Sequence, residues 1–403
     1  MGNLESQNVL KDLSSGDGRR VRLLMSDSNW LEQSAIDQLV AVSKLQGMHF
    51  VVGMPDLHPG KGQPIGAAFI SKNVIYPHLV GSDIGCGMAL WKLDVKRRKV
   101  KLEKWEKRLS MLSDDDVGAF LSDQDRLSPL EPFNTNGREN KLGTIGGGNH
   151  FTEIQCVQEI FKEDEFVENG FDKESVVMLV HSGSRGLGQQ ILHDHVSAFA
   201  AKGITGSEIE GYLEKHDYAD KWAKENRKRI ADRFRNVLGV GGEQVLDVSH
   251  NHVRIVSAEQ QLSFGLTVQE GGQYWIHRKG SSPTDNGLVM IPGSRGSLSY
   301  LVKPKTHDQA ILAMGGFSLA HGAGRKWKRS DCKGRLQLRF KAKDLETTSL
   351  GGRVICKQRD LLYEEAPQAY KDIEVVVSDL VDAGMIDVIA SFKPLITYKT
   401  TRK

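Results

Sequence analysis

Hydrophobic and polar positions along the chain follow two periods, one typical of strands and one typical of helices. Short apolar runs predict strands at residues 21–25, 50–52, 67–70, 74–76, 88–93 and 176–180. Apolar positions at helical spacing predict helices at residues 31–45 and 187–201, and a longer amphipathic helical segment at residues 206–238. Further strands are expected before His250, before His277 and around residues 292–300, and short strands and helices alternate from Val375 to Tyr398.

Polar, glycine-rich segments separate these elements. A loop rich in glycine and proline is expected from Met54 to Gly62. The chain has no internal repeat, no low-complexity tract and no linker between its motifs. This pattern favours one domain over residues 1–403, with residues 206–238 as a helical insertion.

The composition is typical of a globular protein with a large core. The 403 residues are 39% hydrophobic and 26% charged, with a formal net charge of +3. Basic runs at residues 96–99, 224–235 and 325–329 are either solvated faces or local contacts to nucleic acid. Residues 1–6 show no signal-peptide pattern, and no apolar stretch reaches the about 18 residues of a membrane span. The four cysteines lack CxxC spacing, so we expect a cytoplasmic protein without disulfides or a zinc ribbon.

Histidines in small or polar surroundings are the main chemical signal. Thirteen histidines occur in the chain, and six of them lie in small, glycine-rich or polar surroundings: His150, His181, His250, His252, His277 and His321. Glycine allows the backbone to approach a ligand closely. Several such clusters in one chain point to a binding site gathered from distant segments.

A thiol and a carboxylate extend this set. Asp83 and Cys86 lie three residues apart in the glycine-rich segment 81–87. Together with His150, His181 and His250 they form five ligands, which suits two ions sharing the thiolate better than one open catalytic ion. Ligand softness alone points to zinc or iron.

Three glycine-rich loops, at residues 146–149, 183–186 and 293–296, are of the kind that hold oxyanions. Arg185, Arg295 and Arg325 lie in or beside such segments and suit phosphate recognition. His321, outside the ligand set, is free to act as a nucleophile on phosphorus. The alternative is a core or supporting histidine. These features together suggest phosphoryl transfer on a nucleotide or nucleic acid.

Eight segments resemble, in order, the motif series of the RtcB family of RNA ligases. They are residues 54–58 (MPDLH), 81–87 (GSDIGCG), 146–151 (GGGNHF), 181–186 (HSGSRG), 247–251 (DVSHN), 277–280 (HRKG), 292–294 (PGS) and 321–325 (HGAGR). The resemblance implies an α+β fold of mixed β-sheets with surrounding helices and a deep central cleft for two metal ions. It implies a GTP- and manganese-dependent ligase that joins a 3′-phosphate or 2′,3′-cyclic phosphate RNA end to a 5′-hydroxyl end, in RNA repair or tRNA splicing. The preference for Mn²⁺ is implied by the resemblance against the softness argument.

The resemblance also assigns roles to residues. It makes five side chains the ligands of two Mn²⁺ ions, with Cys86 bridging: Asp83, Cys86, His150, His181 and His250. His321 matches the histidine that accepts GMP from GTP, and we assign Arg325, in the same motif, a catalytic role as well. Six further residues match nucleotide-binding positions: Asn149, Glu153, Ala323, Gly324, Tyr370 and Lys399.

Departures from the family motifs occur at residues 281–285, at Arg295 and at residues 326–330. We expect all three where RNA or the nucleotide passes. Trp327 either stacks on an RNA base among its basic neighbours or packs inward. Two other functions stay open: a two-metal phosphoesterase acting on RNA ends, and a non-catalytic RNA-end binder. The sequence leaves open the natural RNA, the oligomeric state and the need for a helper or repair partner protein.

Overall fold

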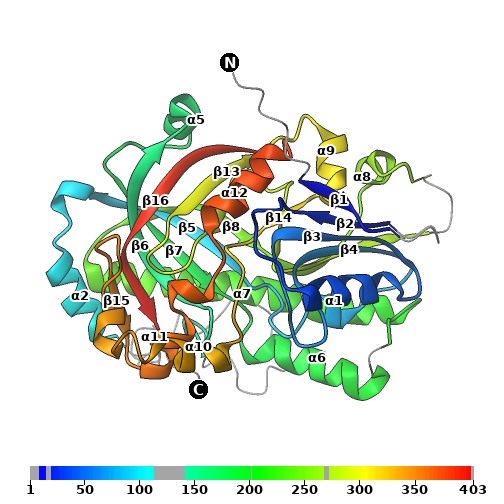
Figure 1. Ribbon diagram of the computed structural model, residues 1–403, viewed down its shortest axis with the longest axis horizontal. Helices are drawn as coiled ribbons and strands as arrows, with labels where there is room; N and C mark the ends of the chain where they lie inside the picture. Colours follow the sequence, from blue (N-terminus) through cyan, green and yellow to red (C-terminus); the bar gives the residue numbers. More distant parts are fainter. Residues whose placement is uncertain (1–8, 15–19, 113–140, 201, 267–271, 401–403) are drawn as a thin grey trace.

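A computed structural model describes residues 9–14, 20–112, 141–200, 202–266 and 272–400. Figure 1 shows two large sheets beside each other, with helices around them. One sheet has the strand order β1 (Leu10–Asp12), β2 (Arg20–Leu24), β3 (Met48–His58), β4 (Ile65–Lys72), β10 (Tyr274–Lys279) and β9 (Asn251–Ile255). The α+β fold expected from the sequence is confirmed.

The second sheet carries most of the site described below. Its order is β12 (Val289–Pro292), β13 (Ser299–Pro304), β16 (Ile386–Lys399), β6 (Phe151–Ile160), β7 (Ser175–Ser182), β5 (Gly87–Lys96) and β8 (Gly242–Ser249). The strand β15 (Arg353–Cys356) lies parallel to β16. A short pair, β11 (Ser281–Pro283) with β14 (Ser318–Ala320), forms a third sheet among the described residues.

Ten α-helices lie in the described part of the chain. They are α1 (Gln33–Ser43), α2 (Leu102–Ser110), α5 (Glu163–Glu168), α6 (Gly186–Phe199), α7 (Glu208–Leu238), α8 (Ala258–Ser263), α9 (Gln309–Met314), α10 (Arg329–Leu336), α11 (Arg359–Glu364) and α12 (Ile373–Asp382). The predicted helices at 31–45 and 187–201 correspond to α1 and α6, although residue 201 lies outside the described residues.

Apolar packing joins the helices to both sheets. Val52 of β3 and Ile291 of β12 belong to one buried cluster with Val376 of α12, so this core lies between the two large sheets. Ile230 and Phe234 of α7 pack in another cluster with strands β5, β6 and β7. The predicted helical segment 206–238 is therefore one long helix against the second sheet, and it ends at Gly239, whose φ of 71° is left-handed.

Two local predictions were wrong. Residues 74–76 form no strand and contribute only an isolated bridge at Ile75, because Asn73 with φ 61° ends the extended run. The expected loop from Met54 instead continues β3 to His58. A register irregularity between Gly53 and His58 leaves this stretch buried but displaced from regular pairing with β4. Asp56 lies in this irregular stretch.

Candidate metal and nucleotide site

Strand ends of the second sheet bring the predicted metal ligands together. Gly87 at the start of β5 pairs with Ser182 at the end of β7 and with Ser249 at the end of β8. The start of β6 lies beside the end of β7. Four predicted ligands are in or next to these strand ends, and Asp83 lies in the loop just before β5; the four are Cys86, His150, His181 and His250.

Cys86 lies at the centre of this cluster. Its Sγ is 3.4 Å from Nε2 of His150 and 3.2 Å from Nε2 of His181. Asp83 Oδ2 is 2.8 Å from His150 Nε2. Two groups of ligand atoms, each within 4.8 Å of one another, share Cys86: one with Asp83 and His150, the other with His181 and His250. The geometry suits two ions that share one thiolate.

The buried donors of the cluster fit divalent cations. Burial raises the pKa of Cys86 well above its usual range and lowers the pKa values of His181 and His250 well below theirs. Asp83 Oδ1 and His250 Nδ1 are buried without a hydrogen-bond partner among the described residues. A bound cation uses neutral imidazoles and stabilises a thiolate, so it would satisfy all of these groups.

His321 lies beside the cluster and is held by a buried carboxylate. The His321 and His250 ring centroids are 4.7 Å apart. Nδ1 of His321 is 2.6 Å from Oδ2 of Asp56, and the backbone N–H of His321 donates to the same oxygen over 3.2 Å. Asp56 is fully buried. Because Nδ1 donates to the carboxylate, the tautomer with a free lone pair on Nε2 is favoured.

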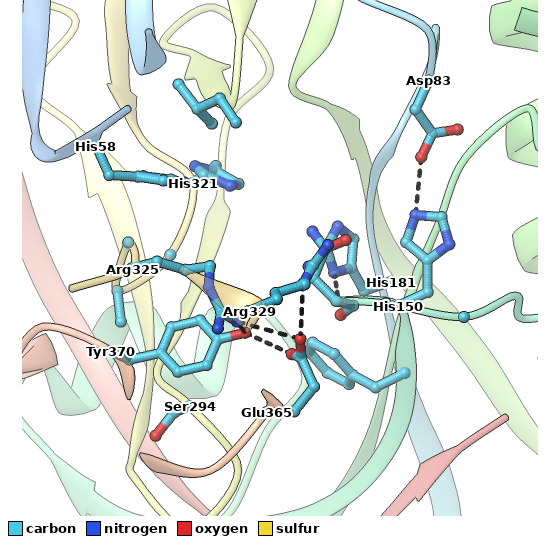
Figure 2. Close-up of a pocket in the computed structure, with 18 of the residues that line it drawn as sticks. His58, Asp83, His150, His181, Ser294, His321, Arg325, Arg329, Glu365 and Tyr370 are labelled. Atoms are coloured by element: carbon cyan, nitrogen blue, oxygen red, sulfur yellow. Dashed lines mark hydrogen bonds and ion pairs between the residues drawn. The ribbon is translucent and has the colours of Figure 1, made fainter. Parts of the chain in front are cut away.

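A cavity of about 1080 Å³ opens onto both the metal cluster and His321. Figure 2 shows Asp83, His150 and His181 on one side of it and His58, His321 and Arg325 on the other. All three predicted oxyanion loops contribute to its lining, through residues 147–149, 185–186 and 293–295. The volume is sufficient for a ligand larger than a metal pair.

Glu153 and Lys399, two predicted nucleotide-binding residues with ionisable side chains, are buried and line the cavity. Burial raises the pKa of Glu153 to about 7, although its carboxylate accepts hydrogen bonds from Gln155 and Thr397. Lys399 Nζ donates to the carbonyl of His150 over 3.0 Å. Asn149 is exposed in the cavity, and its carbonyl lies 3.2 Å from Nδ1 of His181.

Predicted residues Ala323 and Gly324 also line the cavity, beside His321. Gly324 has φ 74°, and a Cβ there would lie 2.2 Å from the carbonyl oxygen of Asp56. Only glycine fits this close approach. The HGAGR motif is therefore pressed against the segment that carries Asp56.

Arg325 and Tyr370 belong to a charged cluster around Glu365. All five N–H groups of the Arg325 guanidinium have protein acceptors: Trp327 O, Glu365 Oε1, Tyr370 Oη, Cys332 Sγ and Glu364 O. Burial would raise the pKa of Glu365, but Lys399, Arg329 and Arg325 lower it to about 2. Arg325 thus links Glu365 and Tyr370 in the cavity wall. Arg329 donates to Glu365 through Nε and also lies near Gly148.

Comparison with known proteins decides the family. The family model described as tRNA-splicing ligase RtcB matches residues 38–128 and 116–400. The chain is 46% identical over 380 residues to an RNA-splicing ligase RtcB2 of Escherichia coli, covering 94% of this chain and 95% of that protein. It is 28% identical to tRNA-splicing ligases RtcB of Methanococcus maripaludis and Archaeoglobus fulgidus, in each case over 91% of both chains. The chain belongs to the RtcB family.

Membership of the RtcB family makes this protein an RNA ligase enzyme. Its described helices include none with the length and apolar character needed to span a bilayer. The four cysteines are free thiols.

The departures from the RtcB motifs fall in two kinds of place. Residues 281–284 are buried, 281–283 pair with β14, and segment 281–285 is not part of the cavity lining, so its expected place on the RNA or nucleotide path stays a prediction. Arg295 and residues 326–330 do line the cavity. Trp327 is half-buried, packs against the apolar cluster of Leu336 and Leu362, and lies 5.0 Å from the Arg335 guanidinium. Trp327 thus packs inward on one side while it lines the cavity, and stacking on an RNA base stays a prediction.

Sequence reasoning missed several residues of the site. Asp56 lies in a quoted motif, but its role depends on the displaced end of β3. Glu365 belongs to no motif. Besides His321, two of the six marked histidines lie outside the metal cluster: His277 accepts from Tyr76 N, and His252 lies 3.5 Å from an Arg278 nitrogen. The sequence around His252 and His277 does not distinguish these two residues from the predicted metal ligands.

Proposed function

We propose that this RtcB-family ligase joins an RNA 3′-phosphate or 2′,3′-cyclic phosphate end to a 5′-hydroxyl end, using GTP and two Mn²⁺ ions. The RNA would be a broken strand that arises in RNA repair or tRNA splicing. The observation that carries the proposal is the placement of His321. Its Nδ1 is held by buried Asp56, and its ring lies against the predicted metal ligand His250.

The proposed chemistry has three steps, each with a balanced transfer. His321 Nε2 attacks the α-phosphorus of GTP, forming a P–N bond and expelling pyrophosphate. An oxygen of the RNA 3′-phosphate then attacks that phosphorus, which frees His321 and leaves GMP on the RNA end. The 5′-hydroxyl finally attacks the RNA phosphate, and GMP leaves as the new phosphodiester forms. A cyclic phosphate end would first be opened by water to a 3′-phosphate.

Asp56 keeps His321 in its reactive state in this proposal. The carboxylate stabilises the ring while Nε2 gains a bond to phosphorus, because the Nδ1 proton remains shared with it. Its burial away from water strengthens this interaction. His321 also becomes oriented, since its backbone N–H is bound by the same oxygen.

The metal ligands in the proposal are the five residues of the Cys86 cluster. When bound there, two Mn²⁺ ions would neutralise phosphate charge and align the reacting oxygens. Asn149, Glu153, Ala323, Gly324, Tyr370 and Lys399 would hold the nucleotide. Because the donors of Arg325 are occupied by protein groups, we assign Arg325 the positioning of Tyr370 and Glu365 rather than contact with phosphate.

Guanylylation tests this proposal against the two alternatives. Incubation with α-labelled GTP and Mn²⁺ should attach label to the chain through an acid-labile, alkali-stable bond, and His321→Gln should abolish it. Removal of RNA end phosphates without any labelled protein would instead support the phosphoesterase. RNA-end binding with neither reaction would support the non-catalytic binder.

The cellular setting is part of the proposal. A reducing cytoplasm would keep the Cys86 thiol available as a metal ligand, and the other three cysteines are free as well. Whether a helper or repair partner protein joins the reaction would be tested by the number of turnovers that the purified chain supports.

A further inference from the structure

Behind the metal cluster, one buried arginine of α7 contacts all three segments of the Cys86–His181–His250 group. Arg227 is fully buried. Its Nη1 donates to the carbonyl of Gly85 over 2.6 Å and to that of Ser182 over 2.8 Å. Its Nη2 lies 3.4 Å from Ser249 Oγ. Each of these three contacts is made to the residue next to a predicted ligand in the sequence.

The other side of the Arg227 guanidinium is fixed by Asp247 of β8. Both Nε and Nη2 donate to Asp247 Oδ1, over 2.9 and 2.5 Å. The guanidinium is planar and rigid, so bonds on one edge determine where the other edge lies. Asp247 therefore orients Arg227 toward Gly85 and Ser182.

The loop that carries Cys86 is pressed directly on α7. Gly85 has φ 72°, and a Cβ there would lie 2.8 Å from the Asp220 Cα and 2.9 Å from the Ala223 Cβ. A neighbouring residue of the helix holds a different segment. Asn226 accepts from Gly143 N and donates to Thr144 O, in the loop that leads to His150.

We propose that Arg227 is a positioning residue of the metal centre, which sets the spacing of Cys86, His181 and His250. This inference rests on the proposed function of the cluster as a metal site. A buried ion pair is a poor way to gain stability, since apolar residues of similar size are often as stable. The Arg227–Asp247 pair has a different role, because Arg227 contacts the residue next to each of three ligands. These contacts fix the ligand geometry before an ion binds.

Cobalt binding to chelator-stripped protein tests the proposal. Co²⁺ bound by Cys86 gives a thiolate-to-cobalt absorption, which reports metal binding without any catalytic activity. In Arg227→Met, one of the two binding steps should weaken by about 10- to 100-fold, the usual effect of removing a group that supports a metal ligand. Arg227→Lys can still donate to Gly85 and Ser182 but loses the two-bond contact to Asp247, so its loss should be smaller.

Two further variants separate positioning from folding. Arg227→Met leaves Asp247 unpaired, so Arg227→Met/Asp247→Leu removes both charges and should restore the melting temperature but not the cobalt affinity. Arg229→Met is the matched control, because Arg229 is a buried arginine of the same helix that pairs with Glu225. It should leave cobalt binding unchanged.

The outcomes are distinguishable. If the double variant binds two Co²⁺ ions as tightly as wild type, with the same absorption, the role of Arg227 is overturned. If wild type itself gives no thiolate-to-cobalt absorption, the proposed metal centre fails, whatever the variants do.

Discussion

The two walls of the cavity are built by different means. The metal wall consists of strand ends in one sheet, where backbone pairing of β5 with β7 and β8 brings the ligands together. The opposite wall contains His321 and the charged cluster, and its geometry depends on side chains, with Glu365 bonded to Arg325 and Arg329. Apart from the contacts of Arg227, a wall built on backbone pairing should tolerate side-chain changes around it, whereas one built on side chains should depend on each partner.

The largest expected effect is on the metal wall itself. Cys86→Ala removes the ligand shared by both groups, so it should abolish metal binding and ligation together. The measurement is metal content after dialysis against Mn²⁺, with ligation assayed in parallel. Cys356→Ala, a free thiol away from the cluster, is the control and should be nearly silent. Wild-type metal content in Cys86→Ala would contradict the proposed site.

Asp56→Asn tests the link between the walls. The amide is neutral and its NH2 group can donate to Nδ1, so His321 should lose its favoured tautomer and guanylylation should slow by roughly 10²- to 10⁴-fold. Metal content should stay at the wild-type level, because Asp56 lies outside the two ligand groups. An unchanged labelling rate with α-labelled GTP would show that Asp56 has no part in the reaction.

Glu365→Gln should show how far the opposite wall depends on one carboxylate. The change leaves Arg325 and Arg329 without their charged partner and should cost about 3 kcal/mol in the free energy of unfolding. The depressed pKa of about 2 means that this stabilisation is present above about pH 4.5 and is lost as pH falls toward 2. Denaturant unfolding of wild type and Glu365→Gln should therefore converge in acid. Asp360→Asn, in an exposed pair with Lys333, should change stability little.

The pKa of Glu153 gives a smaller, pH-dependent prediction. Burial raises it to about 7, so the carboxylate forms only as pH rises through that value. If the ionised form holds the nucleotide, GTP binding should strengthen between about pH 6 and 8. Glu153→Gln should flatten this pH profile. A profile that is unchanged in Glu153→Gln would assign the pH dependence to another group.

The residues of the metal wall could be predicted from the sequence more readily than those of the opposite wall. Asp83, Cys86 and the three histidines lie at strand ends within glycine-rich motifs, so the local sequence marked them. Asp56 was visible only as part of a motif, because its contact with His321 depends on the irregular end of β3. Glu365 follows α11 with no local signal, and its cationic partners come from residues 325, 329 and 399.

The burial of the α7 arginines was the hardest feature to predict from the sequence. The run 224–235 was expected to be a solvated face or a nucleic-acid contact, yet Arg227, Arg229 and Arg233 are buried. Helical periodicity indicates which face of a helix is apolar, but it cannot identify a buried ion pair on that face. The partner Asp247 lies on a strand, so only the fold reveals the pair.

The smallest expected effect concerns the rim of the opposite wall, where residues 326–330 depart from the family motif. Lys328 is exposed and Lys326 half-exposed, both line the cavity, and neither has an acidic partner among the described residues. If they contact RNA phosphates, Lys326→Ala and Lys328→Ala should each lower the log–log salt slope of RNA binding by about 0.7. Guanylylation of His321 should persist, because GTP is held by other groups in the proposal.

Lys343→Ala, which changes an exposed lysine outside the cavity lining, is the control. Unchanged affinity and slope in both variants would show that these lysines form only a solvated face and that RNA selection resides elsewhere in the cavity.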